Sequence, residues 1–553
     1  MPGLGLHFCA MRNTRYVCRC LPVLAVLVLI AQVGAALEPT TVMAPMRDGV
    51  KLATDIYLPE GEGPFPVVLA RSVYGRGFGP DWARPWLEAG AAFVMQDCRG
   101  RGGSEGVDMG FLADGWGELR DGADTVGWLR AQPWCNGKIA TFGGSALGIV
   151  QILAAPATPW ITCQSILVAP ASFYGNISYQ GGVFRKEMME GWLAAQNLPH
   201  VLELWKAHPT YDAFWRGFDA VRVADRVTAP AVHVGGWWDC FGQGTIDAFV
   251  SRQYDGAPPA RGNQKLIMGP WLHGPRRDLG DVILHENYNA VNFDEYTQRF
   301  FRHWLLGEEN GIMDEPAVHY YTVGDLSDPD APGNEWRTAD DWPPFPTRAT
   351  PYYLTPDGGL NAGAVDDVPG GLTFVYDPSD PVPSLGGATL LHKPGIFDQR
   401  PVSDRADVLR FASTPLTEPL EITGRVTVRL YVSTDVKDTD FTAKLVDICP
   451  DGREILMLDG IQRLKFRDSF EAPEYLPPGE IAALEIDLWS ISLIFNTGHR
   501  IGLHISSSNF PRFEINPNTG EDFPSEDEPM PVARNTVYTG VRHPSALILP
   551  IPR

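Results

Sequence analysis

A strand-like run leads straight into a glycine-rich turn and a helix at residues 138–155. Residues 138–142 (KIATF) form a short apolar run typical of a buried strand, residues 143–148 read GGSALG, and residues 149–155 have helical composition. A serine on a sharp strand-to-helix turn has the geometry of a nucleophile elbow, which lifts the hydroxyl above a sheet. Glycines flank the serine because the turn is cramped, and the amides of the new helix point at the same place. The feature therefore predicts a strand–turn–helix unit with Ser145 at its bend.

The turn departs from the usual G-x-S-x-G pattern of such elbows. Leu147 occupies the position of the second glycine, and the glycine falls one residue later, at Gly148. Gly-Ser pairs also end many ordinary strands, so the motif alone leaves both a nucleophile and a structural turn open.

Strand and helix patterns alternate over residues 40–170 and again after residue 228. Strands are predicted at 66–70, 91–95, 165–169, 231–234 and 265–268, and helices at 119–130 and 296–306. Because strands alternate with helices, the expected fold class is α/β with a mostly parallel sheet.

Three further segments have different sequence patterns. Residues 171–228 are rich in Trp, Phe, Leu and Glu at helical spacing, which predicts a helical insertion over the sheet. From about residue 350, short alternating segments at 420–433, 440–447, 462–466, 481–488 and 500–506 predict an all-β sandwich or jelly roll. The Pro- and Asp-rich stretch 326–348 is interpreted as a connector.

The length of 553 residues exceeds what one core supports and favours about three domains. The predicted boundaries are a leader at 1–36, an α/β core at 37–170 and 229–348, a helical cap at 171–228 and a jelly roll at 349–553. The net charge of −22 argues against nucleic acid as a partner, because phosphates repel such a surface.

The N-terminal residues have the features of a signal peptide. Arg12, Arg15 and Arg19 precede an apolar run at 21–31, and small residues follow at 34–36. The run is shorter than the roughly 20 apolar residues of a spanning helix, so we expect a secreted or periplasmic protein without a stable membrane span. A retained N-terminal anchor is the alternative, and Met11 is an alternative start.

The cysteines indicate neither a disulfide framework nor a metal site. Of eight cysteines, five follow the leader, namely Cys98, Cys135, Cys163, Cys240 and Cys449. The set is odd and sparse, and no Cys or His cluster has metal-ligand spacing. We therefore expect no metal and no cofactor.

Two later strand ends supply the partners that a serine nucleophile needs. A base must take its proton, and an acid must orient the base. Asp239 follows the strand at 231–234, and His273 follows the strand at 265–268, which gives the order Ser, acid, His of elbow-type hydrolases. Each residue alone also fits a turn cap or a packed side chain. Glu105, Asp121 and His233 are competitors, but the first two precede the serine and His233 lies inside a strand.

An oxyanion needs two hydrogen-bond donors. The Ala146 amide is one candidate, because it directly follows the serine. No HGGG motif is present in the loop at 71–76, so the Tyr74 hydroxyl is the candidate for the second, although a Tyr that merely packs at a strand end remains open.

Eight short motifs along the chain carry a resemblance to a known family: RSVYG (71–75), DCRGRGGSEG (97–106), GGSALG (143–148), GGWWD (235–239), GPWLHG (269–274), DVLRF (407–411), STDVKDTDF (433–441) and SSSNFPRF (506–513). With these motifs the chain resembles the cocaine esterase and X-prolyl dipeptidyl-peptidase (CocE/NonD) family of α/β-hydrolases. In this family a glycine three residues after the serine is normal.

The resemblance assigns roles to the residues at these motifs. It implies Ser145 as nucleophile, Asp239 as acid, His273 as base, and Tyr74 with the Ala146 amide as oxyanion donors. It also implies a helical cap and a C-terminal jelly roll that helps to wall the site. Asp97 and Arg99 belong to a family loop that is expected to be structural, a strand-end turn fixed by an ion pair.

The substrate is constrained by a departure from related enzymes. The α-amino acid ester hydrolases hold a substrate ammonium with carboxylates two and three residues after the acid, but here these positions are Phe241 and Gly242. Phe241 instead resembles the aromatic wall of an acyl pocket, with Trp238 and Trp192 as further candidates. Phe184, Trp205 and Trp215 are also candidate pocket residues, although aromatic stripes on helices are more often core.

These patterns favour a serine hydrolase of acyl esters, with amides also possible substrates, that acts on an apolar or aromatic acyl group of a small molecule. An X-Pro dipeptidyl-peptidase and a β-lactam or amino-ester acylase are alternatives, as is a glycan-binding protein with an inert hydrolase part. The sequence does not specify an oligomeric state.

Overall fold

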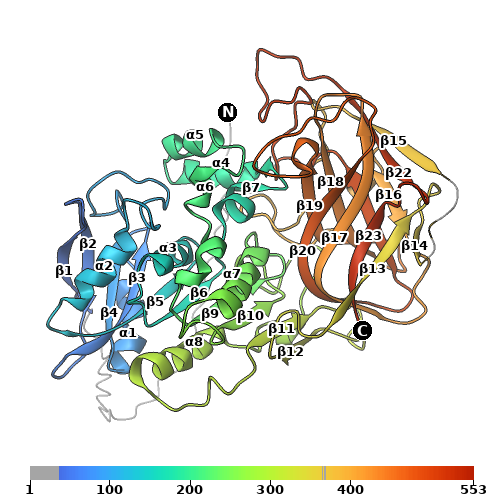
Figure 1. The fold of residues 1–553 in the computed structure, drawn as a ribbon. Coiled ribbons are helices and arrows are strands. Elements are labelled where there is room, and N and C mark those ends of the chain that lie inside the picture. The colour runs from blue at the N-terminus through green and yellow to red at the C-terminus, as the bar shows by residue number, and fades with distance from the viewer. Residues whose placement is uncertain (1–36, 364, 366–368) are drawn as a thin grey trace, which may run out of the picture. The chain divides into compact units, whose positions relative to one another are not determined.

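The structure is a computed structural model that describes residues 37–363, 365 and 369–553 (Figure 1). The predicted leader lies outside the described residues. Within the described part of the chain, none of the helices combines the length and apolarity that crossing a bilayer requires.

A ten-stranded sheet forms the first half of the described chain. Its order is β1-β2-β4-β3-β5-β6-β9-β10-β11-β12. The strands are β1 (Thr40–Pro45), β2 (Lys51–Tyr57), β3 (Phe65–Ser72), β4 (Ala92–Asp97), β5 (Cys135–Gly144), β6 (Cys163–Leu167), β9 (Ala231–Gly236), β10 (Lys265–Gly269), β11 (Val318–Thr322) and β12 (Glu335–Ala339). Strands β4 to β11 pair in parallel, and the outer strands are antiparallel. The central strands are buried along nearly their whole length, as expected when both faces are covered.

Helices cover both faces of this sheet. The ring of Phe142 on β5 lies 5.5 Å from Trp82 on α1 (Gly79–Glu88), whereas the neighbouring Thr141 donates a 2.7 Å hydrogen bond to Gln151 on α3 (Ala146–Ala154). Because successive strand residues point to opposite faces, α1 and α3 lie on opposite sides. Helix α8 (Phe293–Phe301) contacts α1, and α2 (Asp121–Arg130) contacts α3. Helix α7 (Gly242–Asp255) follows β9.

The segment between β6 and β9 is mostly helical, with one short hairpin that the sequence did not predict. It contains η2 (Tyr174–Ser178), β7 (Tyr179–Gln180), β8 (Val183–Phe184), α4 (Lys186–Ala195), α5 (Pro199–Lys206), α6 (Ala213–Arg216) and η3 (Ala220–Arg226). The hairpin turns at Gly181 and Gly182, both at positive φ, and two-residue strands are too short to leave a periodic signal.

The C-terminal part is all-β and antiparallel. One sheet has the order β14-β13-β23-β17-β22-β15 with β20 on β17, and a second has the order β16-β21-β18-β19. Its elements are β13 (Thr347–Leu354), β14 (Leu360–Ala362), β15 (Gly370–Tyr376), α9 (Arg400–Ser403), β16 (Leu409–Ala412), β17 (Leu420–Thr434), β18 (Asp440–Ile448), β19 (Glu454–Arg463), η6 (Leu464–Phe466), β20 (Ala482–Phe495), β21 (Arg500–Ser506), β22 (Ala533–Thr539) and β23 (Ala546–Pro552).

Three local predictions differ from the structure. The predicted connector 326–348 contains β12, whose half-exposed edge residues carry little apolar signal among prolines and aspartates. The predicted strand 462–466 is mostly the short 3₁₀-helix η6. Its residues are buried, so their apolar pattern resembles that of a buried strand. The predicted helix 296–306 is α-helical only to Phe301 and continues as a short π-helix, η5 (Arg302–Leu306). The predicted domain boundaries stay predictions.

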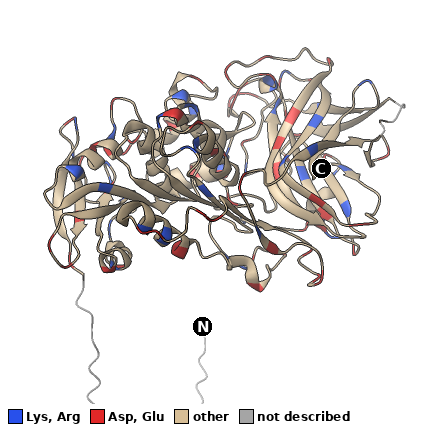
Figure 2. Ribbon diagram, turned by 60° about the horizontal axis from the view of Figure 1, so that its bottom comes forward, with Lys and Arg blue, Asp and Glu red and all other residues tan. Residues whose placement is uncertain are grey.

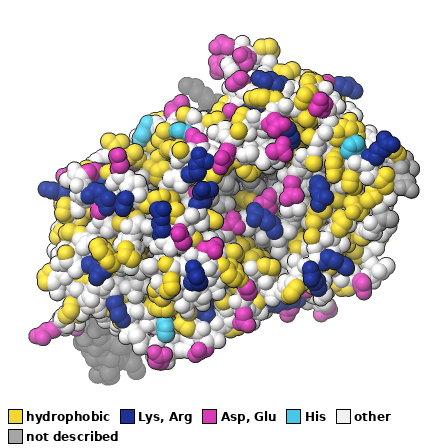
Figure 3. Space-filling view, viewed as in Figure 1, with side chains coloured by type: hydrophobic (Ala, Val, Ile, Leu, Met, Phe, Trp, Pro, Cys, Tyr) yellow, Lys and Arg dark blue, Asp and Glu magenta, His cyan; other side chains and the backbone are white. Residues whose placement is uncertain are grey.

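The α/β part and the β-rich part share one buried core. Val318 on β11 and Val428 on β17 belong to the same hydrophobic cluster, and Val323 bridges to Leu493 on β20. In Figure 2 acidic and basic residues lie interspersed over both parts. Figure 3 shows charged and hydrophobic side chains mixed over the visible face.

Candidate active site

Ser145 lies at a sharp bend between β5 and α3. Its backbone has φ 55° and ψ −122°, a left-handed conformation that is uncommon for a residue with a side chain. The bend is held by the Ser145 N–H, which donates to the Leu167 carbonyl at 2.9 Å, and by the Ser145 carbonyl, which accepts from Gly148 and Ile149 at 2.8 Å each. This is the geometry that the GGSALG motif predicts.

The position of Gly148 follows from helix–strand packing. A Cβ at Gly148 would lie 2.6 Å from the Ala169 Cβ and 3.0 Å from the Leu167 carbonyl oxygen. The first turn of α3 therefore approaches the end of β6 too closely for any side chain. Leu147 instead turns its side chain over Gly143, where an added Cβ would meet the Leu147 Cβ at 2.6 Å. The displaced glycine of the motif is thus a packing requirement.

His273 joins Ser145 to Asp239. Its Nε2 lies 2.8 Å from Ser145 Oγ, and its Nδ1 lies 2.7 Å from Asp239 Oδ1. An ionised carboxylate only accepts hydrogen bonds, so Nδ1 carries the proton, and Nε2 of the neutral ring accepts the proton of the serine hydroxyl. The three side chains follow β5, β9 and β10, at the carboxyl ends of parallel strands.

A residue of the helical segment holds the loop that carries Asp239. Asp239 is fully buried, and its second carboxylate oxygen has no hydrogen-bond donor among the described residues. Arg185, which precedes α4, donates a 2.9 Å hydrogen bond to the Cys240 carbonyl, and Cys240 Sγ lies 3.7 Å from His273 Nδ1. Among the described residues, His273 is thus the hydrogen-bond partner of the buried Asp239 carboxylate.

The two candidate oxyanion donors lie at neighbouring strand ends. Tyr74 follows β3, which pairs in parallel with β5. Its N–H donates to Ser72 Oγ at 3.0 Å, and its hydroxyl oxygen accepts a 3.1 Å hydrogen bond from Trp192 Nε1. Ala146 is the first residue of α3, so its amide has no partner within the helix.

A narrow apolar pocket lies beside the serine. Its lining residues come from loops, α3, the helical segment and the β-rich part: Phe111, Ser145, Ala146, Ile149, Ile177, Met188, Met189, Trp192, Trp205, Phe241 and Leu390. None of these side chains is charged. Phe111 has φ 75° and stacks on Trp192, with ring centroids 5.3 Å apart. The pocket suits an uncharged, apolar group.

The predicted pocket residues are distributed unevenly. Phe241 and Trp192 line the pocket, and so does Trp205. Trp238 does not, because it is buried in the core shared with the β-rich part, where its Nε1 donates to the Met457 carbonyl at 2.8 Å. Phe184 and Trp215 are likewise buried in the helical segment. Ser145, Ala146 and Ile149 belong to the predicted elbow and its helix. The other lining residues stand in segments without a recognisable motif, so the sequence offered no signal for them.

The competing residues are engaged elsewhere. Glu105 accepts from the Lys51 N–H at 3.0 Å, and Asp121 pairs with Arg99 at 2.7 Å. His233 is fully buried, and burial lowers its pKa to about 3, so it stays neutral beside Gln264.

Ion pairs hold the loop at 97–106, and Asp97 and Arg99 have different partners. Asp97 pairs with Arg76 and accepts from the Gly103 N–H at 2.8 Å, whereas Arg99 pairs with Asp48 and Asp121. Asp97 ends β4 and Arg99 lies in the turn that follows, so the two side chains pair with different residues.

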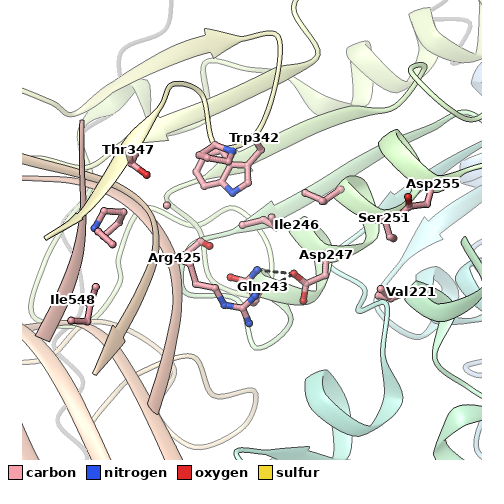
Figure 4. Close-up of a pocket in the computed structure, with 16 residues that line it drawn as sticks. Val221, Gln243, Ile246, Asp247, Ser251, Asp255, Trp342, Thr347, Arg425 and Ile548 are labelled. Carbon is pink, nitrogen blue, oxygen red and sulfur yellow. Dashed lines mark hydrogen bonds and ion pairs between the residues drawn. The ribbon is translucent and has the colours of Figure 1, made fainter. Parts of the chain in front are cut away.

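A larger cleft of about 650 Å³ lies between α7 and the β-rich part (Figure 4). Gln243 donates to Asp247 at 2.8 Å, and Arg425 lies opposite. The residues lining this cleft include Ser251 and Ser490 but no histidine to activate either. It therefore does not support nucleophilic chemistry.

Family models match two stretches of the chain. X-Pro dipeptidyl-peptidase (S15 family) matches residues 48–200 and 193–275, and the X-Pro dipeptidyl-peptidase C-terminal non-catalytic domain matches residues 310–548. Cocaine esterase from Rhodococcus sp. (strain MB1 Bresler) is 34% identical over 93% of this chain and 98% of its own. The chain belongs to the CocE/NonD family of α/β-hydrolases. It is a serine hydrolase of that family.

Solved structures agree with this family fold. An aminopeptidase from a marine sediment archaeon, Thaumarchaeota archaeon, has a TM-score of 0.80 at 26% identity, covering 93% of this chain and 96% of its own. An α-amino acid ester hydrolase has a TM-score of 0.77 at 26% identity with the same coverage. A CocE/NonD family hydrolase from Staphylococcus aureus, 21% identical over 93% of each chain, shares the fold with a TM-score of 0.71. An α/β-hydrolase part followed by a β-rich C-terminal domain is thus the family's architecture.

Proposed function

We propose that this protein is a secreted or periplasmic esterase that cleaves acyl esters with an apolar or aromatic acyl group through an acyl-enzyme on Ser145. The observation that carries the proposal is the pair of hydrogen bonds of His273, 2.8 Å to Ser145 Oγ and 2.7 Å to Asp239 Oδ1, at the edge of an apolar pocket.

The first half-reaction acylates the serine. Ser145 Oγ attacks the ester carbonyl carbon while His273 Nε2 takes its proton, and Asp239 stabilises the imidazolium. The carbonyl oxygen becomes an oxyanion that accepts hydrogen bonds from the Ala146 N–H and the Tyr74 hydroxyl. His273 then gives its proton to the alcohol oxygen as the C–O bond breaks.

The second half-reaction releases the acid. A water molecule attacks the acyl carbon while His273 Nε2 takes its proton, and the same proton returns to Ser145 Oγ as the acyl bond breaks. The sum is ester plus water to acid plus alcohol, and it needs no cofactor.

The chemistry of the pocket lining favours uncharged acyl groups over charged ones. A free ammonium in a pocket without charged side chains loses its hydration and gains no counter-charge, which costs several kcal/mol. This disfavours amino-ester, amino-β-lactam and X-Pro substrates. An uncharged alkyl or benzoyl group buries apolar surface at no such cost.

Hydrolysis of p-nitrophenyl butyrate and of Ala-Pro-p-nitroanilide by the wild type and by Ser145→Ala tests the proposal. We expect the wild type to cleave the ester and not the anilide, and Ser145→Ala to lose at least a thousandfold in kcat, because no nucleophile remains. The matched control is Ser178→Ala, next to pocket residue Ile177, which removes a buried hydroxyl for which the described residues offer no hydrogen-bond partner. Full activity of Ser145→Ala contradicts the assignment of Ser145 as the nucleophile.

Two further measurements address the alternatives. Labelling by a fluorophosphonate probe that is lost in Ser145→Ala separates an active hydrolase from an inert glycan-binding protein. Fractionation of cells and the N-terminal residue of the mature protein test secretion, since an anchor retains residues 1–36 in the membrane fraction.

A further inference from the structure

Trp192 connects the acyl pocket to the candidate oxyanion donor. Its ring lines the pocket beside Ser145, and its Nε1–H donates to the Tyr74 hydroxyl oxygen at 3.1 Å. Phe111 stacks on the indole at an interplanar angle of 18° and so restricts its rotation. The side chain of Trp192, on α4, thus lines the proposed acyl pocket and also binds Tyr74.

The hydroxyl of Tyr74 needs such a partner in order to act as a fixed donor. Tyr74 is 46% exposed, so water competes for its hydroxyl group. A tyrosine hydroxyl has one proton that rotates about the C–O bond. A donor that binds one lone pair of the oxygen turns the proton away from itself. Partial desolvation raises the pKa of the Tyr74 hydroxyl and outweighs the lowering by the Trp192 hydrogen bond, so the proton stays on the oxygen at neutral pH.

We propose that Trp192 is a positioning residue of the oxyanion hole, whose indole N–H holds the Tyr74 hydroxyl so that its proton points at the developing oxyanion. The inference rests on the proposed function, in which Tyr74 donates to that oxyanion. A donor that is already oriented stabilises the transition state more than one that must be turned during the reaction.

The geometry also couples the acyl pocket to the chemical step. An acyl group that fills the pocket presses on the Trp192 ring, which Phe111 supports from the stacked side. Acyl fit therefore affects the orientation of Tyr74, and through it kcat as well as KM. The helical segment takes part in transition-state stabilisation and does not only cover the site.

The test is Trp192→Phe, which keeps an aromatic ring and removes the N–H. With p-nitrophenyl acetate, whose acyl group is too small to fill the pocket, we expect kcat to fall about tenfold with KM within about twofold, as for the loss of one transition-state hydrogen bond. Titration of active sites with a fluorophosphonate normalises kcat to folded enzyme.

The comparison variant is Trp205→Phe. Trp205 lines the same pocket, and its Nε1 has no hydrogen-bond partner in the described chain, so this change alters the pocket shape without removing a bond. Both variants are measured alone and combined with Tyr74→Phe. We expect the effect of Trp192→Phe on kcat to vanish in the Tyr74→Phe background, whereas the effect of Trp205→Phe persists there.

Three outcomes overturn the inference, and they separate it from the proposed function. An equal loss from Trp192→Phe in both Tyr74 backgrounds, or no loss from Trp192→Phe at all, refutes the positioning role while the Ser145 mechanism stands. An unchanged kcat in Tyr74→Phe refutes both the oxyanion role of Tyr74 and the inference. Activity in Ser145→Ala refutes the proposed function itself.

Discussion

Ser145 keeps a backbone conformation that its side chain disfavours. Non-glycine residues held in sparsely populated regions cost about 1–3 kcal/mol and persist where the surroundings determine them. Here the Leu167 carbonyl, the first turn of α3 and the glycines on both sides determine it. The bend places Oγ 2.8 Å from His273 Nε2, so the strain is retained where it positions the proposed nucleophile.

Asp239 gives the most direct test at the residue scale. An amide in place of the carboxylate donates as well as accepts, so Asp239→Asn stabilises the wrong His273 tautomer and leaves the imidazolium uncompensated. We expect kcat for p-nitrophenyl butyrate to fall about 10⁴-fold, the scale known for this change in serine proteases. Steady-state kinetics at pH 8 measure it.

The control for this change is Asp225→Asn, which neutralises an exposed aspartate of η3. A fall of tenfold or less in Asp239→Asn, with unchanged circular dichroism, contradicts the role of Asp239 as orienting acid.

At the scale of elements, a loop of the β-rich part completes the pocket. Leu390 lines it, and the next two residues, Leu391 and His392, donate their backbone N–H groups to the carboxylate of Glu187 on α4, the latter at 2.6 Å. Leu391 packs over Gly191, where an added Cβ would lie 2.5 Å from its Cδ1. Glu187 therefore anchors the loop that carries a pocket wall.

Glu187→Gln tests this anchor. A neutral amide oxygen accepts more weakly than a carboxylate, and a hydrogen bond to a charged group contributes about 1.5–3 kcal/mol. We expect KM for p-nitrophenyl hexanoate to rise about fivefold or more, with KM for p-nitrophenyl acetate little changed, because only the longer acyl group reaches Leu390.

Glu190→Gln is the matched control on the same helix, since Glu190 pairs with Lys186 and Lys206 and not with the loop. The anchor is refuted when Glu187→Gln and Glu190→Gln change the two KM values alike.

At the scale of the whole molecule, the features that local sequence motifs define were predictable, whereas those that depend on contacts between distant segments were not. The elbow and the two later strand ends were predictable because Ser145, Asp239 and His273 each follow a strand that the local sequence pattern reveals. Parallel strands bring their carboxyl ends to one edge of the sheet, so residues that follow such strands meet there. The β-rich part was predictable from its alternation. The pocket was not, because Phe111, Met188 and Leu390 come from three segments that meet only in the folded chain. Trp238 shows the converse, since a residue beside the acid in sequence packs into the core.

The junction of the two parts contains a histidine between two carboxylates. His499, before β21, lies 3.1 Å from Asp325 in the loop after β11 and 2.9 Å from Asp447 on β18. Burial lowers the pKa of His499, but the hydrogen bonds to both carboxylates outweigh it and raise the pKa to about 9. Burial raises the pKa of the nearby Cys449 thiol to about 12, so this thiol stays neutral over the range in which His499 titrates.

This arrangement predicts a pH-dependent stability. A group whose pKa is raised by folding stabilises the fold fully below its unfolded pKa, about 6.5 for histidine, and loses that contribution as the pH rises through the folded value. We expect the free energy of unfolding to fall by about 3 kcal/mol at most between pH 6.5 and pH 10 on account of His499, since one pKa unit corresponds to about 1.4 kcal/mol. Urea unfolding at several pH values measures it. His499→Gln should flatten this dependence, whereas His543→Gln, in the loop before β23, should keep it. An equal slope in wild type and His499→Gln contradicts the prediction, and it means that the charge of His499 does not hold the two parts together.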